Sequence, residues 1–419
     1  MPLPHYTQSR ASSQRYEPIQ PNLFEVTVFS PLGDDTGLIL EQVKSIGGLN
    51  NINPTKMDPI LSLMAAYRAD PREQKIDLGV GVYMDDRGHT PVMRAVKEAE
   101  ARLMELEDTK SYQGIAGDPQ YNEHILALLF GAQHSILKSG RVRTIQAPGG
   151  SGALRVGAEL IGRAKPNAKV WVGIPTWPNH IPLISGAGLK IQEYPYYDLV
   201  ARKINVEAMM ETLRGVPSGD IVLLHGCCHN PTGADLTEEQ WDQIADLALE
   251  RGFIPYIDTA YQGLGEGLEV DAYGVRSMAM KLPEMIIASS CSKNFGLYRE
   301  RTGSITFLSA TPAQADIVAS QAMSVARQMY SMPPAHGALL VAMILGDQQL
   351  RAQWSQELDE VRDRINAMRQ LLTERIQQND AGMDFSHIQQ QRGMFSFLGI
   401  ASQQIERLRD EYGIYIVSS

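Results

Sequence analysis

The sequence predicts an α/β fold in which a mostly parallel sheet is covered by helices. Short apolar runs alternate with amphipathic helical patterns from about residue 140 to residue 310, which is typical of strands joined by crossover helices. The chain has 419 residues and 43% hydrophobic content, enough for a large core. Helical and strand-like patterns recur near both chain ends, so we expect these ends to form a second, smaller α/β domain.

The domain boundaries follow from where these patterns change. We expect an N-terminal extension over 1–50, a small domain from 51–89 and 350–419, and a large domain over 90–349. Before residue 21 the extension carries Arg10 and Arg15, and Glu17 is its only acid. This composition is faintly similar to an organelle transit peptide, but a disordered extension is the preferred interpretation.

The periodicity predicts the individual elements. Helices are expected over 58–69, 89–106, 119–130, 155–161, 206–213, 238–251, 313–329, 335–345, 348–376 and 405–412. Strands are expected over 76–83, 144–146, 169–174, 191–197, 220–225, 253–257, 285–288, 304–308, 394–398 and 415–417. Pro91 suits a first helical turn, and Thr237 with Gln240 has the spacing of a capping box.

Composition and charge exclude several functional classes. The net charge is −10 and no long basic run occurs, so we expect no nucleic-acid partner and a cytoplasmic location. No apolar run reaches the roughly 18 residues of a membrane helix. The three cysteines are Cys227, Cys228 and Cys291, and this pattern predicts neither a disulfide framework nor a metal site.

Polar side chains follow two of the predicted strands at the point where each strand ends. Asp258 and Tyr261 come after the apolar run 253–257, and Lys293 follows Ser290 and Ser292 after the run 285–288. Arg301 follows a few residues later. Ligands of α/β sheets bind at the carboxyl ends of strands. A lysine, an acid and an anion-binding arginine at adjacent strand ends suit pyridoxal phosphate, which needs an amine, a carboxylate and phosphate donors.

Two further features could serve the same ligand. The glycine-rich turn 148–154, which contains Gly150 and Ser151, precedes a helical pattern and would offer backbone N–H groups to a phosphate. A tight turn without a ligand is the alternative. Trp177 follows the strand 169–174 and could stack on a flat ring, although core packing would equally explain it.

Four motifs carry a resemblance to a known family. They are PGGSGAL at 148–154, HGCCHNPTG at 225–233, DTAYQG at 258–263 and SCSKNFGLY at 290–298. From about residue 58 to its end, the chain resembles class I (fold type I) aminotransferases that depend on pyridoxal phosphate, in the aspartate and aromatic amino acid subgroup. The resemblance implies that the mostly parallel sheet is of the seven-stranded type. Members of this subgroup are homodimers with shared active sites, so the resemblance also implies a homodimer.

The resemblance implies roles for the catalytic residues. Lys293 would form the internal aldimine with the cofactor and then move the substrate proton; a solvated surface lysine is its alternative. Asp258 would keep the pyridine nitrogen protonated, with a structural ion pair as its alternative. Tyr261 and Asn230 would donate to the phenolic oxygen of the cofactor, although an Asn before Pro is also a common turn residue.

Other residues are implied to hold the phosphate and the ring. Arg301 would bind the phosphate bidentately, and Trp177 would stack on the pyridine ring. Tyr112 would reach the phosphate of the neighbouring subunit. His180 would lie behind Asp258, although a satisfied core histidine is its alternative. The phosphate cup would be completed by Gly150, Ser151, Ser290 and Ser292.

Substrate contacts are implied for Gly81, Trp177, Asn230 and Arg327. Arg327 would be lent across the dimer to the side-chain carboxylate of dicarboxylic substrates; a solvated helix residue is its alternative. Met84 and Met332 stand where aspartate-specific members tend to carry a lysine and an asparagine, and flexible methionines leave room for an aromatic ring. We therefore expect an aromatic amino acid:2-oxoglutarate aminotransferase first and an aspartate aminotransferase second.

Two other classes stay open, and the chain end adds an expectation. A non-transaminating enzyme of the same fold, such as a β-lyase, or a non-catalytic module that binds the cofactor would carry similar motifs. In the subgroup, a Ser-Gly-Arg step supplies the arginine that binds the α-carboxylate of the substrate. This sequence stops at Ser418-Ser419, and Arg392 is not an obvious substitute. We expect the chain as given to hold the cofactor but to transaminate feebly.

Overall fold

The computed structural model describes residues 52–54, 59–79, 81–379 and 382–417. All but the first three belong to one unit that begins at Pro59. The predicted extension over 1–50 and the chain end at 418–419 lie outside the described residues. The division into a large and a small domain stays a proposal.

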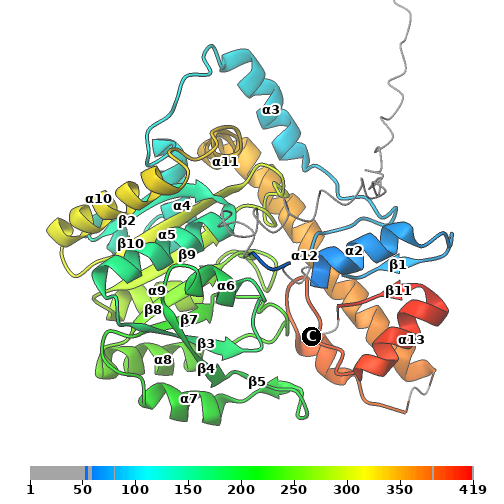
Figure 1. Ribbon diagram of the computed structural model, residues 1–419. Coiled ribbons are helices and arrows are strands. Elements are labelled where there is room, and N and C mark those ends of the chain that lie inside the picture. Colours follow the sequence, from blue (N-terminus) through cyan, green and yellow to red (C-terminus); the bar gives the residue numbers. More distant parts are fainter. Residues whose placement is uncertain (1–51, 55–58, 80, 380–381, 418–419) are drawn as a thin grey trace, which may run out of the picture. The chain divides into compact units, whose positions relative to one another are not determined.

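A seven-stranded sheet forms the centre of this unit (Figure 1). Its order is β2 (Val142–Pro148), β10 (Thr302–Leu308), β9 (Met285–Ser290), β8 (Ile254–Thr259), β7 (Ile221–His225), β3 (Lys169–Ile174) and β4 (Lys190–Pro195). Strand β10 is antiparallel to both of its neighbours, and the remaining pairs are parallel. This arrangement confirms the predicted fold class.

The sheet has a hydrophobic core on each face. Successive residues of β7 alternate between the two cores: Ile221 and Leu223 belong to one, Val222 and Leu224 to the other. One core includes residues of α5 (Gly149–Ala164), α6 (His180–Ser185) and α10 (Pro312–Met329). The other includes residues of α4 (Pro119–Phe130), α7 (Val206–Arg214), α8 (Glu238–Arg251), α9 (Tyr273–Lys281) and α11 (His336–Gly346). Burial on both faces explains why the strands are continuous apolar runs in the sequence.

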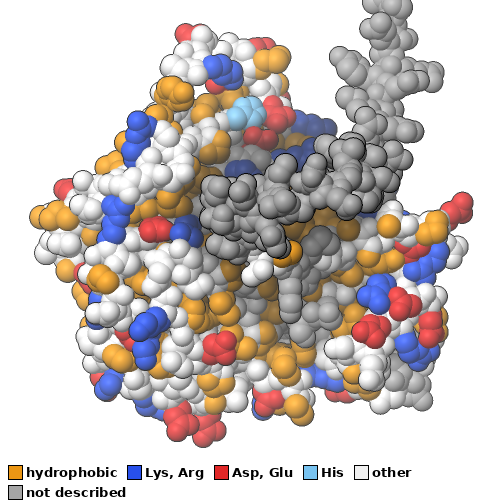
Figure 2. Space-filling view, viewed as in Figure 1, with side chains coloured by type: hydrophobic (Ala, Val, Ile, Leu, Met, Phe, Trp, Pro, Cys, Tyr) orange, Lys and Arg blue, Asp and Glu red, His pale blue; other side chains and the backbone are white. Residues whose placement is uncertain are grey.

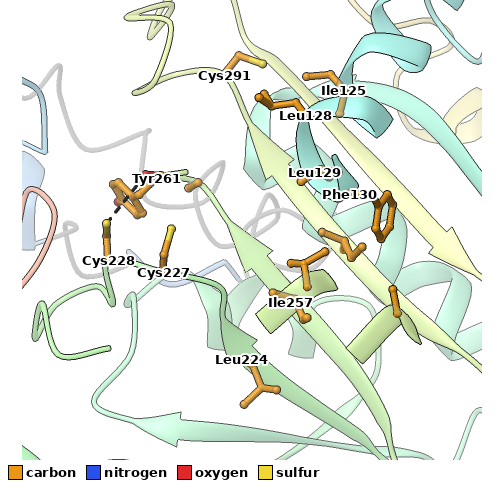
Figure 3. Close-up of a cluster of buried hydrophobic side chains, with 14 of the residues drawn as sticks. Ile125, Leu128, Leu129, Phe130, Leu224, Cys227, Cys228, Ile257, Tyr261 and Cys291 are labelled. Carbon is orange, nitrogen blue, oxygen red and sulfur yellow. Dashed lines mark hydrogen bonds between the residues drawn. The ribbon is translucent and has the colours of Figure 1, made fainter. Parts of the chain in front are cut away.

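Figure 3 shows part of the second core, to which Leu128 and Phe130 of α4 and the strand residues Ile257 and Leu224 all belong. The same view contains Cys227, Cys228 and Cys291, and all three are free and buried. Burial raises the pKa of the Cys291 thiol to about 12, so this sulfur stays protonated and packs as a small apolar group.

The remaining elements join the two ends of the described chain. Helix α2 (Pro59–Ala69) and the short strand β1 (Ile76–Asp77) come first, and α13 (Ser402–Tyr412) and β11 (Ile414–Tyr415) come last. Strand β1 pairs in parallel with β11, with Ile76 opposite Ile414. The long helix α12 (Gln348–Gln378) packs against α3 (Arg94–Leu106) and α11, and β5 (Tyr197–Asp198) with β6 (Lys203–Ile204) forms a small hairpin. The pairing of β1 with β11 thus joins two segments that are far apart in the sequence.

Two predicted strands are wrong or too long, because side chains bind their backbone. The strand expected over 76–83 ends at Asp77, whose carboxylate accepts the N–H of Gly79 at 2.9 Å. Residues 394–398 form no strand. The Arg369 guanidinium donates to the carbonyls of Gly393 and Phe395. Backbone groups that side chains have satisfied cannot join a ladder.

Two helix starts also differ from the sequence prediction. The sequence predicts a helix start at residue 89, but helix α3 begins at Arg94. At this start the Glu357 carboxylate accepts the N–H groups of Arg94 and Ala95 at 2.6 and 2.9 Å. Helix α5 begins inside the glycine-rich motif, at Gly149. The capping box of Thr237 and Gln240 at the start of α8 is present as predicted.

On the face drawn in Figure 2, acidic and basic side chains are interspersed over the described residues. Among these residues, no helix is both long and apolar enough to cross a membrane.

Candidate functional site

A cavity of about 810 Å³ lies at the carboxyl ends of the parallel strands. Strand β8 contributes Asp258, β9 contributes Ser290, and β7 contributes His225. Eleven of the residues predicted from the sequence line this one cavity. They are Gly81, Gly150, Ser151, Trp177, Asn230, Asp258, Tyr261, Ser290, Ser292, Lys293 and Arg301.

Lys293 lies in the turn that follows β9, with its amine inside the cavity. The Nζ atom is 4.8 Å from the centroid of the Tyr261 ring. Burial lowers the pKa of the Lys293 amine below its ordinary value; Asp258 opposes this shift and Arg301 adds to it. A lowered pKa raises the neutral fraction of the amine, and the neutral amine is the form that acts as a nucleophile and a base.

Asp258, at the end of β8, has one carboxylate oxygen bound and the other free. Its Oδ2 atom accepts a hydrogen bond from His180 Nε2 at 2.9 Å. Its Oδ1 atom is buried and has no partner among the described residues. Burial acts to raise the pKa of Asp258, but His180 and the charge of Lys293 bring it below its ordinary value. The carboxylate is therefore charged and has an acceptor available for a ligand.

A chain of hydrogen bonds fixes the proton of His180. The N–H of Asn230 approaches His225 Nδ1 at 3.5 Å, so His225 carries its proton on Nε2 and donates to Thr176 Oγ1 at 3.0 Å. Thr176 then donates to His180 Nδ1 at 2.8 Å. Burial lowers the pKa of His225 to about 3, which keeps this ring neutral. His180 consequently presents Nε2–H to Asp258.

An anion-binding cup lies at the N-terminus of α5. Gly149 has φ +67°, and a Cβ there would come within 2.5 Å of Arg301 Nη2, so only glycine permits this approach. Arg301 donates to the Tyr298 carbonyl at 3.0 Å and to Ser292 Oγ at 3.4 Å. No carboxylate within the described ranges pairs with Arg301. A guanidinium beside a helix N-terminus and two serines suits a phosphate.

The donor set as a whole fits one small ligand. The free Asp258 oxygen accepts an N–H, the Lys293 amine can bind a carbonyl carbon, and the cup around Arg301 takes an anion. Asn230 Nδ2 and the Tyr261 hydroxyl are 3.5 Å apart, and both residues line the same cavity as further donors. These groups match the ring nitrogen, aldehyde, phosphate and phenolic oxygen of pyridoxal phosphate.

Four residues that the sequence singled out do not line this cavity. Tyr112 is 91% exposed. Arg327, in the last turn of α10, donates to Ser331 Oγ. Neither residue lines the cavity of its own chain, and neither do Met84 and Met332.

Sequence reasoning missed two groups of cavity residues. The first group is His225, which ends a predicted strand, and Thr176, which follows another. Their positions at strand ends could have suggested a role in the site. The second group is an apolar wall from the C-terminal segment. The ring of Phe395 packs edge to face against the ring of Tyr261, and the two ring centroids are 5.8 Å apart. A Cβ added at Gly81 would lie 3.3 Å from the Phe395 ring. The wall includes Met394, Phe395, Phe397, Leu398, Ile400, Ile405, Ile416 and Val417.

Comparison with known proteins places the chain in a family. The family model described as aminotransferase class I and II matches residues 73–419. Among similar proteins, the aspartate aminotransferase of Salmonella typhi is 48% identical over 88% of this chain and 93% of its own length. The aromatic-amino-acid aminotransferase of Pseudomonas aeruginosa is 47% identical over 86% of this chain and 90% of its own length.

Solved structures agree with these relatives. The crystal structure of the aromatic-amino-acid aminotransferase from Burkholderia pseudomallei, covalently bound to pyridoxal phosphate, superimposes with a TM-score of 0.87. It is 43% identical, and the match covers 89% of this chain and 94% of that one. With a family model that spans most of its length and relatives close to half identical, this chain belongs to the class I and II aminotransferases.

Proposed function

We propose that this chain uses pyridoxal phosphate to move the amino group of an aromatic or dicarboxylic L-amino acid to 2-oxoglutarate. The observation that carries the proposal is the Lys293 amine at a strand end beside Asp258, whose Oδ1 atom is buried and free. When bound, pyridoxal phosphate supplies an electron sink that makes the Cα proton of the amino acid acidic.

The residues of the chain have separate tasks in this proposal. Arg301, Ser290, Ser292, Gly150 and Ser151 hold the phosphate, and Trp177 covers the ring. Asp258, kept charged by His180, holds a proton on the ring nitrogen. Tyr261 and Asn230 donate to the phenolic oxygen. The Lys293 amine holds the cofactor and moves the substrate proton, which its lowered pKa permits.

We further propose a homodimer in which each chain lends Tyr112 and Arg327 to the site of its partner. The support is that both side chains lie outside the cavity of their own chain, and Tyr112 is 91% exposed. A large aromatic side chain exposed to this degree suits an interface. A cytoplasmic location stays a proposal that rests on composition and charge alone.

Aromatic amino acids are the first proposed substrates and aspartate is the second. The apolar wall, with Phe395 and Leu398, favours a bulky apolar side chain in the cavity. Arg327 favours a dicarboxylic substrate as well. Both relatives named above fit this pair of specificities, since one is an aspartate and the other an aromatic-amino-acid aminotransferase.

The purified chain, loaded with pyridoxal phosphate and given phenylalanine and 2-oxoglutarate, is expected to form phenylpyruvate and glutamate in equal amounts. Chromatography of both products with an ammonia assay checks this. The β-lyase alternative is tested with a β-substituted amino acid, since such an enzyme releases ammonia and pyruvate without a 2-oxo acid acceptor. Ammonia release of that kind, with no glutamate formed from phenylalanine, would contradict transamination.

Arg327→Ala is expected to lower kcat/KM for aspartate about a hundredfold more than kcat/KM for phenylalanine. A bidentate charge-assisted pair is worth roughly 3 kcal/mol, and only a dicarboxylic substrate can form it here. Steady-state kinetics on both substrates measures the ratio. Arg407→Ala, which removes an exposed arginine of α13 that pairs with Glu411, is the control and leaves the ratio unchanged. Equal losses for the two substrates in Arg327→Ala would remove Arg327 from substrate recognition.

A further inference from the structure

Helix α12 has a row of buried side chains, and Trp354 is the largest of them. Leu350, Trp354 and Leu358 follow each other at four-residue spacing and are all buried, with Trp354 at 0% exposure. This spacing places them in one row along the helix. Trp354 lines no part of the cavity, so direct contact with a ligand there does not account for it.

Trp354 instead holds the turn that carries Lys293. Its indole Nε1 donates to the backbone carbonyl of Asn294, the residue directly after Lys293, at 2.7 Å. Its ring stacks on Phe295, with centroids 4.4 Å apart and planes inclined by 9°. Two consecutive residues after Lys293 are thus fixed by one side chain, through a polar and an apolar contact.

Few other hydrogen bonds hold residues 293–295 within the described part of the chain. The N–H of Cys291 still donates to the Thr302 carbonyl at 3.0 Å just beyond β9, and the next backbone bond is that of Gly296, whose N–H donates to the Lys293 carbonyl at 3.0 Å. The Oδ1 atom of Asn294 is buried without a partner among the described residues, so this oxygen does not anchor the turn. Without the indole donor, the peptide between Asn294 and Phe295 would be freer to rotate.

We propose that Trp354 is a positioning residue for Lys293, because it fixes the peptide that follows Lys293 and thereby the place of the amine beside Asp258 and Tyr261. The inference rests on the proposed role of Lys293 as the amine that holds the cofactor. The phosphate cup around Arg301 contains no residue of α12, so it should keep its affinity when the Trp354 contact is lost.

The test is Trp354→Phe, which keeps an aromatic ring for Phe295 and removes only the indole donor. With cofactor bound, kcat for phenylalanine should fall about tenfold, the value expected for one lost hydrogen bond, while KM stays within about twofold. The pH midpoint of the visible absorption band should move by about half a unit. Cofactor affinity, measured by equilibrium dialysis, should change less than about twofold.

Trp171→Phe is the matched control. Trp171 also donates from its indole, to Asp220 Oδ2 at 3.0 Å, but on β3 and away from the cavity. This variant loses the same kind of bond, so its Tm should fall as in Trp354→Phe, yet its kcat and pH midpoint should match the wild type. Hydrogen exchange adds a second readout: Trp354→Phe should speed exchange in residues 291–298 and leave α12 protected.

Several outcomes would overturn the proposal. Unchanged kcat and pH midpoint in Trp354→Phe, or equal shifts in Trp171→Phe, would reduce Trp354 to a packing residue. If Trp354→Phe does not fold, Phe295→Leu is the deciding variant, because it keeps the indole donor and removes the stacked ring. It should shift kcat and the pH midpoint in the same direction as Trp354→Phe but by a smaller amount. The absence of any shift in Phe295→Leu would overturn the inference. Borohydride reduction and peptide mapping of the wild type test the proposed function separately: cofactor mass on another lysine would refute the role of Lys293 itself.

Discussion

Replacement of Lys293 by alanine is expected to lower transamination by about 10⁴-fold or more. The variant loses both the covalent hold on the cofactor and the amine that moves the proton, and general acid–base catalysis alone contributes about 10²–10⁴. The cup formed by Arg301, Ser290 and Ser292 remains, so the variant should still bind the cofactor without a covalent link. Borohydride reduction followed by peptide mass mapping should find the cofactor on Lys293 in the wild type and on no peptide of the variant.

The control is Lys281→Ala. Lys281, at the end of α9, pairs with Asp246 at 2.8 Å and lines no part of the cavity. Its loss should leave labelling and rate unchanged. Full activity of Lys293→Ala, or label on Lys281 or any other lysine, would show that the amine of the active site is elsewhere.

Replacement of Asp258 by asparagine is expected to lower kcat by roughly 10²–10⁴-fold. Removal of one partner from a buried charged pair costs about 3–5 kcal/mol, and Asp258 contacts both His180 and the ring nitrogen of the bound cofactor in our proposal. Because the pKa of Asp258 lies below its ordinary value, its charge persists above the unfolded pKa and is lost only as pH falls through the folded pKa. In the wild type this group should therefore cause no loss of activity between pH 7 and pH 5.

Single-turnover kinetics with phenylalanine measures the Asp258→Asn effect apart from cofactor loading. Asp220→Asn is a matched control, because Asp220 is also a buried acid just outside a strand of the same sheet and accepts from Trp171 and from the N–H of Lys169. It stands at the opposite end of β7 from His225. A comparable loss in Asp220→Asn would mean that buried charge in general, and not the position of Asp258, sets the rate.

The strand ends were the most predictable part of this molecule. Strands β7, β8 and β9 are buried on both faces and so appear in the sequence as short apolar runs that stop where polar residues begin. Parallel strands end on one edge, so Asp258 and Lys293 had to meet near that edge. The resemblance to a family then assigned individual residues to the phosphate and the ring, and the structure brings all of these except Tyr112 into one cavity.

Other parts depend on side-chain contacts that no local pattern encodes. Residues 394–398 have the composition of a strand, but the buried Arg369 of α12 takes their carbonyls. The relay through His225 and Thr176 requires the ends of two strands to be adjacent, β3 and β7, which only the sheet order reveals. The roles of Tyr112 and Arg327 stay predictions, because their predicted site belongs to a second copy of the chain.

The parallel pairing of β1 with β11 has a consequence for the order in which the molecule assembles. Nearly the whole described chain lies between Ile76 and Ile414, so their pairing closes a very long loop. The entropy cost of closing such a loop makes the contact a late event in folding. The sheet that carries Asp258 and Lys293 forms from contacts much closer along the chain. A nascent chain can therefore complete its cofactor cup before the apolar wall with Phe395 and Ile416 exists, and early cofactor binding would stabilise that intermediate.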